Sequence, residues 1–172
     1  METHPGKHLF IDDFFIESMQ GTRRVLNQPQ KLTVDAPLEI PMDCAWEAGS
    51  PRFSRVIYIE EVGRFRLYYT SWINGLALVC ALDSADGVTW KKPSLGLVEF
   101  EGSTDNNITN CPAGELAILW DPHESDPCRR WKRIDNKPTG TDAEEKQQWH
   151  AHVSADGYDW HELPVGDHSA RS

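Results

Sequence analysis

Ser84-Ala85-Asp86-Gly87-Val88-Thr89-Trp90 returns almost letter for letter as Ser154-Ala155-Asp156-Gly157-Tyr158-Asp159-Trp160, 70 positions further along the chain. A β-rich run precedes each heptapeptide, and a proline (Pro93, Pro164) follows each. A repeat of this kind indicates a chain built from copies of one supersecondary unit. Asp-Gly favours a tight turn, and the Ser and Asp side chains can accept hydrogen bonds from turn N–H groups. We therefore interpret the repeat as scaffold, with its tryptophan packed between neighbouring copies.

Two sets of strand-like segments surround the repeat. Period-2 alternation and β-branched or aromatic residues identify them. The first set comprises residues 55–59, 64–70, 76–82 and 89–92, and the second comprises residues 115–120, 130–134, 148–153 and 159–162. Asn74-Gly75 favours a hairpin, because both residues tolerate the positive φ of a tight primed turn. No segment keeps a 3.6-residue period, so we expect little helix.

This organisation predicts an all-β fold, because two consecutive four-stranded meanders suggest neighbouring blades of a β-propeller. We expect one partial propeller domain over residues 1–172, with about two antiparallel blades plus an N-terminal strand. Residues 1–50 would supply that strand and a loop, residues 51–100 the first blade and residues 101–164 the second. Residues 165–172 resemble the start of a third blade, so the chain is expected to be an N-terminal fragment.

Charge and composition narrow the classes of function. The formal net charge is −10, which argues against a nucleic-acid partner, because phosphate binding needs clustered Lys and Arg. No apolar run approaches the length that spans a membrane, and no secretory signal is visible, so we expect a cytoplasmic protein without a membrane partner. The four cysteines have no metal-finger spacing, so we expect free thiols in or near a core, with one disulfide left open.

Several segments resemble a known group of proteins. They are Leu9–Glu17, Leu95–Phe100, Asp105–Ile108, Trp120–His123 and the two Ser-x-Asp-Gly-x-x-Trp turns. They resemble bacterial hypothetical proteins similar to the five-bladed propellers of glycoside hydrolase families 32 and 43. The resemblance implies a carbohydrate ligand and a catalytic set spread over the first three blades. Because five blades need roughly twice this length, it also implies a chain that is incomplete and inactive alone.

Glycoside hydrolysis usually requires two carboxylates on opposite sides of the scissile bond. In a propeller the inner strands line the central funnel, so the candidates are acids at or before those strands: Glu47, Asp105 and Asp167. Each has an alternative interpretation as a solvated loop carboxylate, and the roles of acid and base stay open. Three further residues are candidates for substrate binding. Trp46 offers a stacking face, Arg52 a charge and Asn107 a hydrogen-bond donor.

Other classes of site and function remain as alternatives. His150 and His152 face the same way on a predicted strand, but no third ligand stands at a telling spacing. We therefore predict no metal site and no cofactor. The competing function is a non-catalytic module that binds a glycan or a protein. A partial propeller would also leave open sheet edges, through which copies of the chain could associate.

Overall fold

The computed structural model describes residues 16–28, 40–49, 51–114, 117–139 and 146–164. The chain divides into two units, residues 1–34 and 35–172. The described part of the first unit contains no helix or strand, and every element below belongs to the second unit. The predicted N-terminal strand, apart from Ile16, and the predicted third-blade segment with Asp167 lie outside the described residues.

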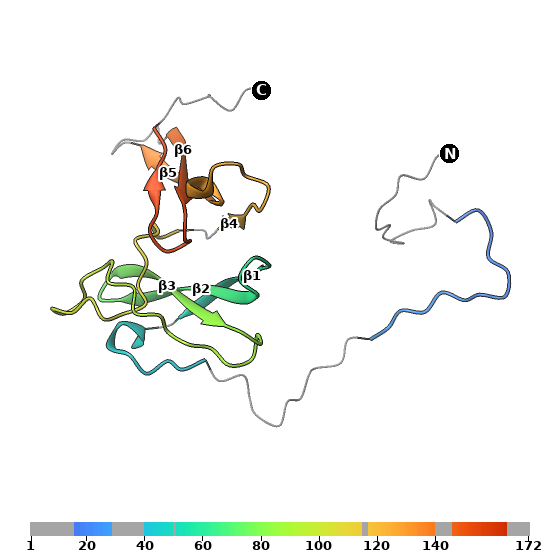
Figure 1. Ribbon diagram of the computed structural model, residues 1–172, viewed down its shortest axis with the longest axis horizontal. Coiled ribbons are helices and arrows are strands. Elements are labelled where there is room, and N and C mark those ends of the chain that lie inside the picture. The colour runs from blue at the N-terminus through green and yellow to red at the C-terminus, as the bar shows by residue number, and fades with distance from the viewer. Residues whose placement is uncertain (1–15, 29–39, 50, 115–116, 140–145, 165–172) are drawn as a thin grey trace. The chain divides into compact units, whose positions relative to one another are not determined.

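The first sheet is an antiparallel meander in the order β1-β2-β3 (Figure 1). Its strands are β1 (Arg52–Ile59), β2 (Arg64–Ile73) and β3 (Leu76–Ser84), and a short 3₁₀ turn, η1 (Ala45–Glu47), precedes them. Asn74 and Gly75 both have positive φ, as a tight turn between β2 and β3 requires. The predicted hairpin is therefore confirmed.

The second sheet is a four-stranded antiparallel meander in the order β4-β5-β6-β7. Its strands are β4 (Ala117–Trp120), β5 (Trp131–Thr139), β6 (Lys146–Ser154) and β7 (His161–Glu162), with a 3₁₀ turn, η2 (Pro127–Arg129), before β5. The all-β prediction is confirmed, although β5 and β6 extend beyond the strands predicted at residues 130–134 and 148–153. In the described residues neither sheet closes on itself, and no helix has the length and apolar character needed to cross a membrane.

The fourth strand predicted for the first copy is wrong. Residues 89–92 form only an isolated bridge, Asp83 with Lys91, so the first sheet has three strands. The Asp86 carboxylate accepts hydrogen bonds from the backbone N–H groups of Val88 and Thr89 at 2.8 and 2.7 Å, so these groups serve the turn. Pro93 has no N–H to donate to a ladder. The turn bonds recur in the second copy, where β7 forms, so Pro93 is what limits the pairing: its equivalent Leu163 donates to the carbonyl oxygen of Ala151 at 2.8 Å.

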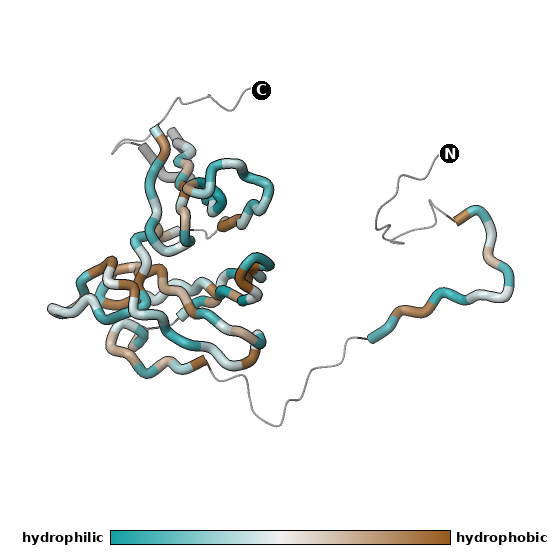
Figure 2. The backbone as a smooth tube through the Cα atoms, viewed as in Figure 1, coloured by the Kyte–Doolittle hydropathy of each residue, from teal (hydrophilic) through white to brown (hydrophobic). Residues whose placement is uncertain are grey.

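The two sheets share a core. Tyr68, Val79 and Ala81 of the first sheet belong to the same buried cluster as Ile118 and Trp131 of the second. Apolar residues recur along the strands of both sheets (Figure 2), and burying apolar surface of this kind is the main favourable contribution to folding.

The second copy of the repeat packs onto β2. The Tyr68 hydroxyl donates to the carbonyl oxygen of Gly157 at 2.8 Å, and Arg66 donates to the carbonyl oxygen of Asp156. Trp160, the tryptophan of this copy, lies in the shared core. Its predicted position between the copies is therefore confirmed. The turn is therefore part of the contact between the sheets.

The other side of the first sheet is covered by chain segments. Leu67, Tyr69 and Leu82 form a second buried cluster with Ile108 and Trp90. Residues from 40–46 and 98–100 pack against it. The tryptophan of the first repeat therefore packs under these segments and not between the two described sheets. Trp72, near the end of β2, is 49% exposed.

The face of the second sheet turned away from this core carries exposed apolar side chains beside Lys132, the register partner of Leu119. We call Ala117, Leu119, Ile134, Trp149 and Ala151 the outer face; Leu119, Ile134 and Trp149 are 51%, 54% and 67% exposed. The two sheets can be compared by matching the register pair Phe65↔Ser84 of the first with the register pair Trp131↔Ser154 of the second. Each residue of the outer face then has an equivalent position in the first sheet. Ala117 is equivalent to Arg55, and Leu119, Ile134, Trp149 and Ala151 are equivalent to Ile57, Tyr68, Val79 and Ala81 in that order. The last four of these lie in or against the core between the sheets.

Candidate functional site

A small hollow brings together three of the predicted site residues. Its volume is about 140 Å³. Trp46, Asp105 and Asn107, from segments about 60 residues apart, lie in its wall. The complete lining is Cys44, Trp46, Lys92, Pro93, Ser94, Asp105, Asn106 and Asn107. The sequence therefore predicted part of a real concavity.

Trp46 is held at the hollow from several directions. Its indole Nε1 donates to Asn107 Oδ1 at 2.9 Å, and its carbonyl oxygen accepts from Ser71 Oγ at 2.5 Å. Its ring lies edge-on to Phe100 with 6.1 Å between ring centroids. Gly49 lets the chain leave η1 against the backbone of Trp72, where a Cβ would collide with the carbonyl group. These contacts fix a half-buried aromatic ring in the wall.

Asn107 is a structural residue as well as part of the wall. Its side chain is fully buried, and its Nδ2 donates to the Tyr69 hydroxyl at 3.0 Å and to the carbonyl oxygen of Ala81 at 2.8 Å. With Trp46 as a donor to its Oδ1, the amide is committed to neighbours inside the protein. Asp105 differs, because it is exposed and its carboxylate makes no hydrogen bond or ion pair within the described part of the chain.

Glu47 lies behind the hollow and is buried, with none of its side chain exposed. Its Oε1 accepts a hydrogen bond from the Tyr69 hydroxyl. Its Oε2 accepts from the backbone N–H of Cys44 at 3.0 Å and from Lys92 Nζ at 2.6 Å. Buried charges are stable when they are paired and hydrogen-bonded in this way. In this geometry Glu47 anchors η1 and does not face solvent.

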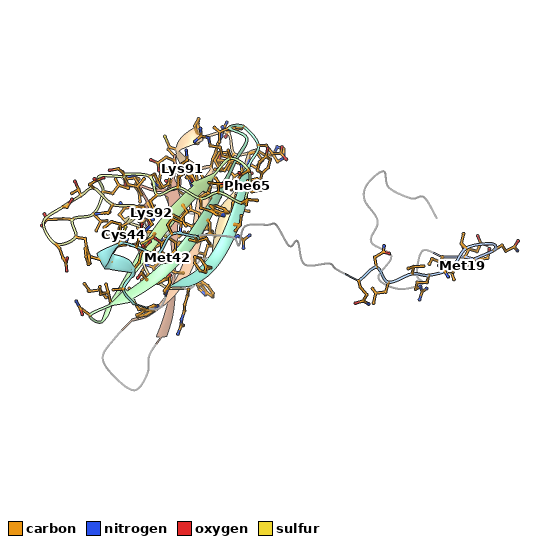
Figure 3. The ribbon with its side chains drawn as sticks, turned by 90° about the horizontal axis from the view of Figure 1, so that it is seen from below. Met19, Met42, Cys44, Phe65, Lys91 and Lys92 are labelled. Atoms are coloured by element: carbon orange, nitrogen blue, oxygen red, sulfur yellow. The ribbon has the colours of Figure 1, made fainter. Side chains whose placement is uncertain are left out.

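Lys92 is the cation of this cluster. Its Nζ lies 2.5 Å from Asp43 Oδ1, 2.6 Å from Glu47 Oε2 and 3.2 Å from Cys44 Sγ. Cys44 and Lys92 lie side by side, although they are far apart in sequence (Figure 3). Burial disfavours the ammonium, but the hydrogen bonds to Asp43 and Glu47 outweigh it, so the pKa of Lys92 is raised above its ordinary value.

The same three partners of Lys92 carry ligand atoms of the types that metals prefer. Asp43, Cys44 and Glu47 place one such atom each within 4.8 Å of one another. The ammonium of Lys92 already contacts all three groups and supplies the positive charge they require. We therefore interpret this cluster as an ion-pair network.

Among the predicted residues that the structure describes, Glu47 and Arg52 do not line the hollow. Arg52 is exposed at the beginning of β1, opposite Thr70 of β2, and it is not part of the wall. Asp167 lies outside the described residues. Conversely, sequence reasoning missed Lys92 and Tyr69, because only the fold brings β2 and the segment after the first repeat to η1.

A larger hollow adjoins the first one. It has a volume of about 520 Å³, and Lys92 and Pro93 belong to the walls of both. Its complete lining is Arg64, Asp83, Ser84, Ala85, Asp86, Thr89, Lys91, Lys92 and Pro93. The two hollows therefore flank the short segment that follows the first repeat.

All four cysteines are free thiols in the structure. Cys80 and Cys111 are buried, and burial raises the pKa of each thiol to about 12. Thiols of this kind are inert, since the reactive form is the thiolate. The prediction of free thiols in the core is confirmed for these two residues, whereas Cys128 is exposed.

Comparison with known proteins yields no relative. The sequence matches no family model, no curated protein and no solved structure. The fold and the site therefore define the class to which the chain belongs, an all-β protein with two antiparallel meanders and a small polar hollow beside the first. The resemblance to glycoside hydrolase families 32 and 43 stays a prediction.

Proposed function

We propose that this chain binds carbohydrate at the hollow formed by Trp46, Lys92, Asp105 and Asn107. The observation that carries the proposal is the meeting of a fixed indole and an exposed carboxylate, from separate segments, in one concavity. Sugars present apolar C–H faces and many hydroxyls. A site that binds them therefore combines an aromatic surface with a few well-placed polar groups.

The residues of the hollow would divide this work. The Trp46 ring would stack against a sugar face, and the Asp105 carboxylate would accept hydrogen bonds from hydroxyls. Because the Asn107 amide is used inside the protein, its role would be to hold the indole in place. A ligand of more than one sugar unit would pass Lys92 and Pro93 into the larger hollow.

Hydrolysis is the second candidate function, and Asp105 is the observation that favours it. This exposed carboxylate on the wall is placed to act as an acid or a base. Glu47 would supply the second carboxylate only if Lys92 released it and its side chain reached the ligand. Binding therefore fits the described geometry better than turnover does.

We further propose that the two sheets are neighbouring blades of a five-bladed propeller like those of glycoside hydrolase families 32 and 43. The equivalence between the outer face of the second sheet and the covered face of the first supports this proposal. The next sheet would pack on Leu119, Ile134 and Trp149 as the second sheet packs on Ile57, Tyr68 and Val79. We expect copies of the chain to associate through the outer face and the open edge at β4.

A glycan-binding screen with the purified full chain tests the proposed function. The expected result is binding to a defined group of neutral or acidic oligosaccharides, with loss on Asp105→Asn. Assaying the same panel for released reducing ends separates the two candidates, because a binding protein would release none. If no glycan in a broad panel binds, the proposed function is wrong.

A further inference from the structure

Two histidines and a carboxylate meet at the edge of the second sheet. His150 and His152 stand two positions apart on β6, so their side chains share one face. Glu162 of β7 is the register partner of His152. His150 Nδ1 lies 2.5 Å from Glu162 Oε1, and His152 Nε2 lies 3.9 Å from Glu162 Oε2. The fold thus supplies a third group that the spacing in the sequence does not reveal.

A second carboxylate stands behind His152. Asp135 Oδ1 lies 3.8 Å from His152 Nδ1, while Asp135 Oδ2 lies 2.9 Å from Arg133 Nη1. The side chains of all three residues are almost completely buried. A histidine that binds a metal through one ring nitrogen commonly has a carboxylate beside the other, which fixes the orientation of its ring. His152 has this environment, with Nε2 toward Glu162 and Nδ1 toward Asp135.

We propose that His150, His152 and Glu162 form a binding site for a divalent transition-metal ion, and zinc is the ion that this set of ligands fits best. Two imidazoles and a carboxylate are common zinc ligands, with water in the fourth position. Around a tetrahedral ion with bonds of about 2.1 Å, neighbouring ligand atoms lie about 3.4 Å apart. The two observed N···O distances, 2.5 and 3.9 Å, lie on either side of that value. The two imidazoles and the carboxylate would have to move closer together around an ion than they lie in this structure.

The position of the site allows an ion to enter and gives it a structural effect. The Glu162 side chain is 46% exposed and that of His150 is 16% exposed, whereas His152 lies deeper at 4%. Water therefore reaches the site from the Glu162 side. In the sheet, β7 contributes two register pairs, His152↔Glu162 and Val153↔His161. A bound ion would link β7 to β6. Because it would bind the folded state alone, it should raise the unfolding temperature.

The test is a titration of the full, reduced chain with zinc by calorimetry and with cobalt by visible absorption. One ion should bind with raised thermal stability, and cobalt should give the spectrum of nitrogen and oxygen ligands without a thiolate charge-transfer band. Glu162→Gln and His150→Gln should each weaken binding by about tenfold or more. Because Glu162 is half exposed, its substitution should leave the fold intact, which circular dichroism verifies.

His161→Gln is the matched control, since His161 is an exposed histidine next to Glu162 on β7 and is not part of the proposed site. It should bind zinc as the unchanged chain does. The proposal is overturned if no ion binds, if the cobalt spectrum shows thiolate ligation, or if His161→Gln abolishes binding. It is also overturned if binding survives both Glu162→Gln and His150→Gln.

Discussion

The guanidinium carbon of Arg66 lies 3.5 Å from the centroid of the Tyr158 ring, so a residue of the first sheet stacks on a residue of the second repeat. The same guanidinium binds Asp83 through Nε at 2.9 Å, and the Tyr158 hydroxyl donates to the other oxygen of Asp83. A cation over an aromatic face is favourable, most of all when water is excluded. Arg66, Asp83 and Tyr158 therefore join the first sheet to the second copy of the repeat.

Alanine substitutions at the two repeat glycines should have unequal effects. Gly87 and Gly157 have φ of +74° and +79°, so Gly→Ala costs about 1–2 kcal/mol at either position for a left-handed conformation. At Gly157 a Cβ would also come within 2.6 Å of the Tyr68 hydroxyl and 2.8 Å of Arg66 Nη1. At Gly87 the nearest atom is a ring carbon of Phe65 at 3.5 Å. Overpacking should add about 1–3 kcal/mol at Gly157 alone.

Urea unfolding of Gly87→Ala and Gly157→Ala measures this difference directly. Equal losses of stability would show that the second repeat does not pack on β2 as described.

Replacing Lys92 by methionine should destabilise the chain strongly. The substitution leaves the buried carboxylate of Glu47 without its cation, and breaking a buried ion pair from one side costs about 3–5 kcal/mol. The double variant Lys92→Met with Glu47→Gln should recover part of the loss, because the unpaired charge is then removed. Chemical denaturation of Lys92→Met, Glu47→Gln and the double variant, each compared with the unchanged chain, forms a double-mutant cycle. Additive losses would contradict the pairing of these two residues.

Acid should weaken the first repeat turn. Hydrogen bonds from the N–H groups of Thr89 and Val88 and from the Ser84 hydroxyl hold the pKa of Asp86 well below its ordinary value of 3.8. Because the pKa is lower in the folded state, the stabilisation is complete above the unfolded pKa and is lost as the pH falls through the folded pKa. Asn can still accept these hydrogen bonds without titrating.

The free energy of unfolding of Asp86→Asn should therefore fall less steeply than that of the unchanged chain between about pH 4 and pH 2. Asp105→Asn, at an exposed carboxylate, is the control and should keep the original slope. Identical slopes for Asp86→Asn and the unchanged chain would refute the role of the Asp86 carboxylate.

Association between copies should depend on the outer face of the second sheet. Ile134→Lys places a charge on this face and should reduce concentration-dependent association in sedimentation velocity. Because Ile134 is 54% exposed, stability should change by no more than about 0.5 kcal/mol. Val56→Lys is a matched control, since Val56 is also 54% exposed but lies on β1. If only Val56→Lys reduced association, copies would meet at the other edge.

Much of the fold could be predicted because its signals are local. The Asn74-Gly75 turn and the alternation along β2 and β3 determine where these strands lie, and the repeated Asp-Gly turn marks the end of β3 and of β6. The missing fourth strand of the first copy could not be predicted this way. Both copies make the same turn hydrogen bonds to Asp86 or Asp156, and the copies differ in that Pro93 stands where the second copy has Leu163, whose N–H pairs with Ala151.

The candidate site was predictable only in part. Trp46 and Asp105 stood out as residue types suited to sugars, and the fold places both at one hollow. The burial of Glu47 and its pairing with Lys92 depend on contacts between segments 45 residues apart, which no local pattern encodes. Likewise, Glu162 meets His150 only because β7 folds back along β6.

The most direct measurement of the central claim is the affinity of the unchanged chain, Asp105→Asn and Glu99→Gln for the best oligosaccharide of the screen, by isothermal titration calorimetry. Glu99 is an exposed acid near Asp105 in the sequence, and it does not line the hollow. Glu99→Gln therefore removes the same charge as Asp105→Asn without changing the hollow. We expect Asp105→Asn to weaken binding by about tenfold, the effect of losing a charged hydrogen bond worth about 1.5 kcal/mol. Glu99→Gln should leave the affinity unchanged. Equal affinities for all three proteins would contradict a carbohydrate site at this hollow.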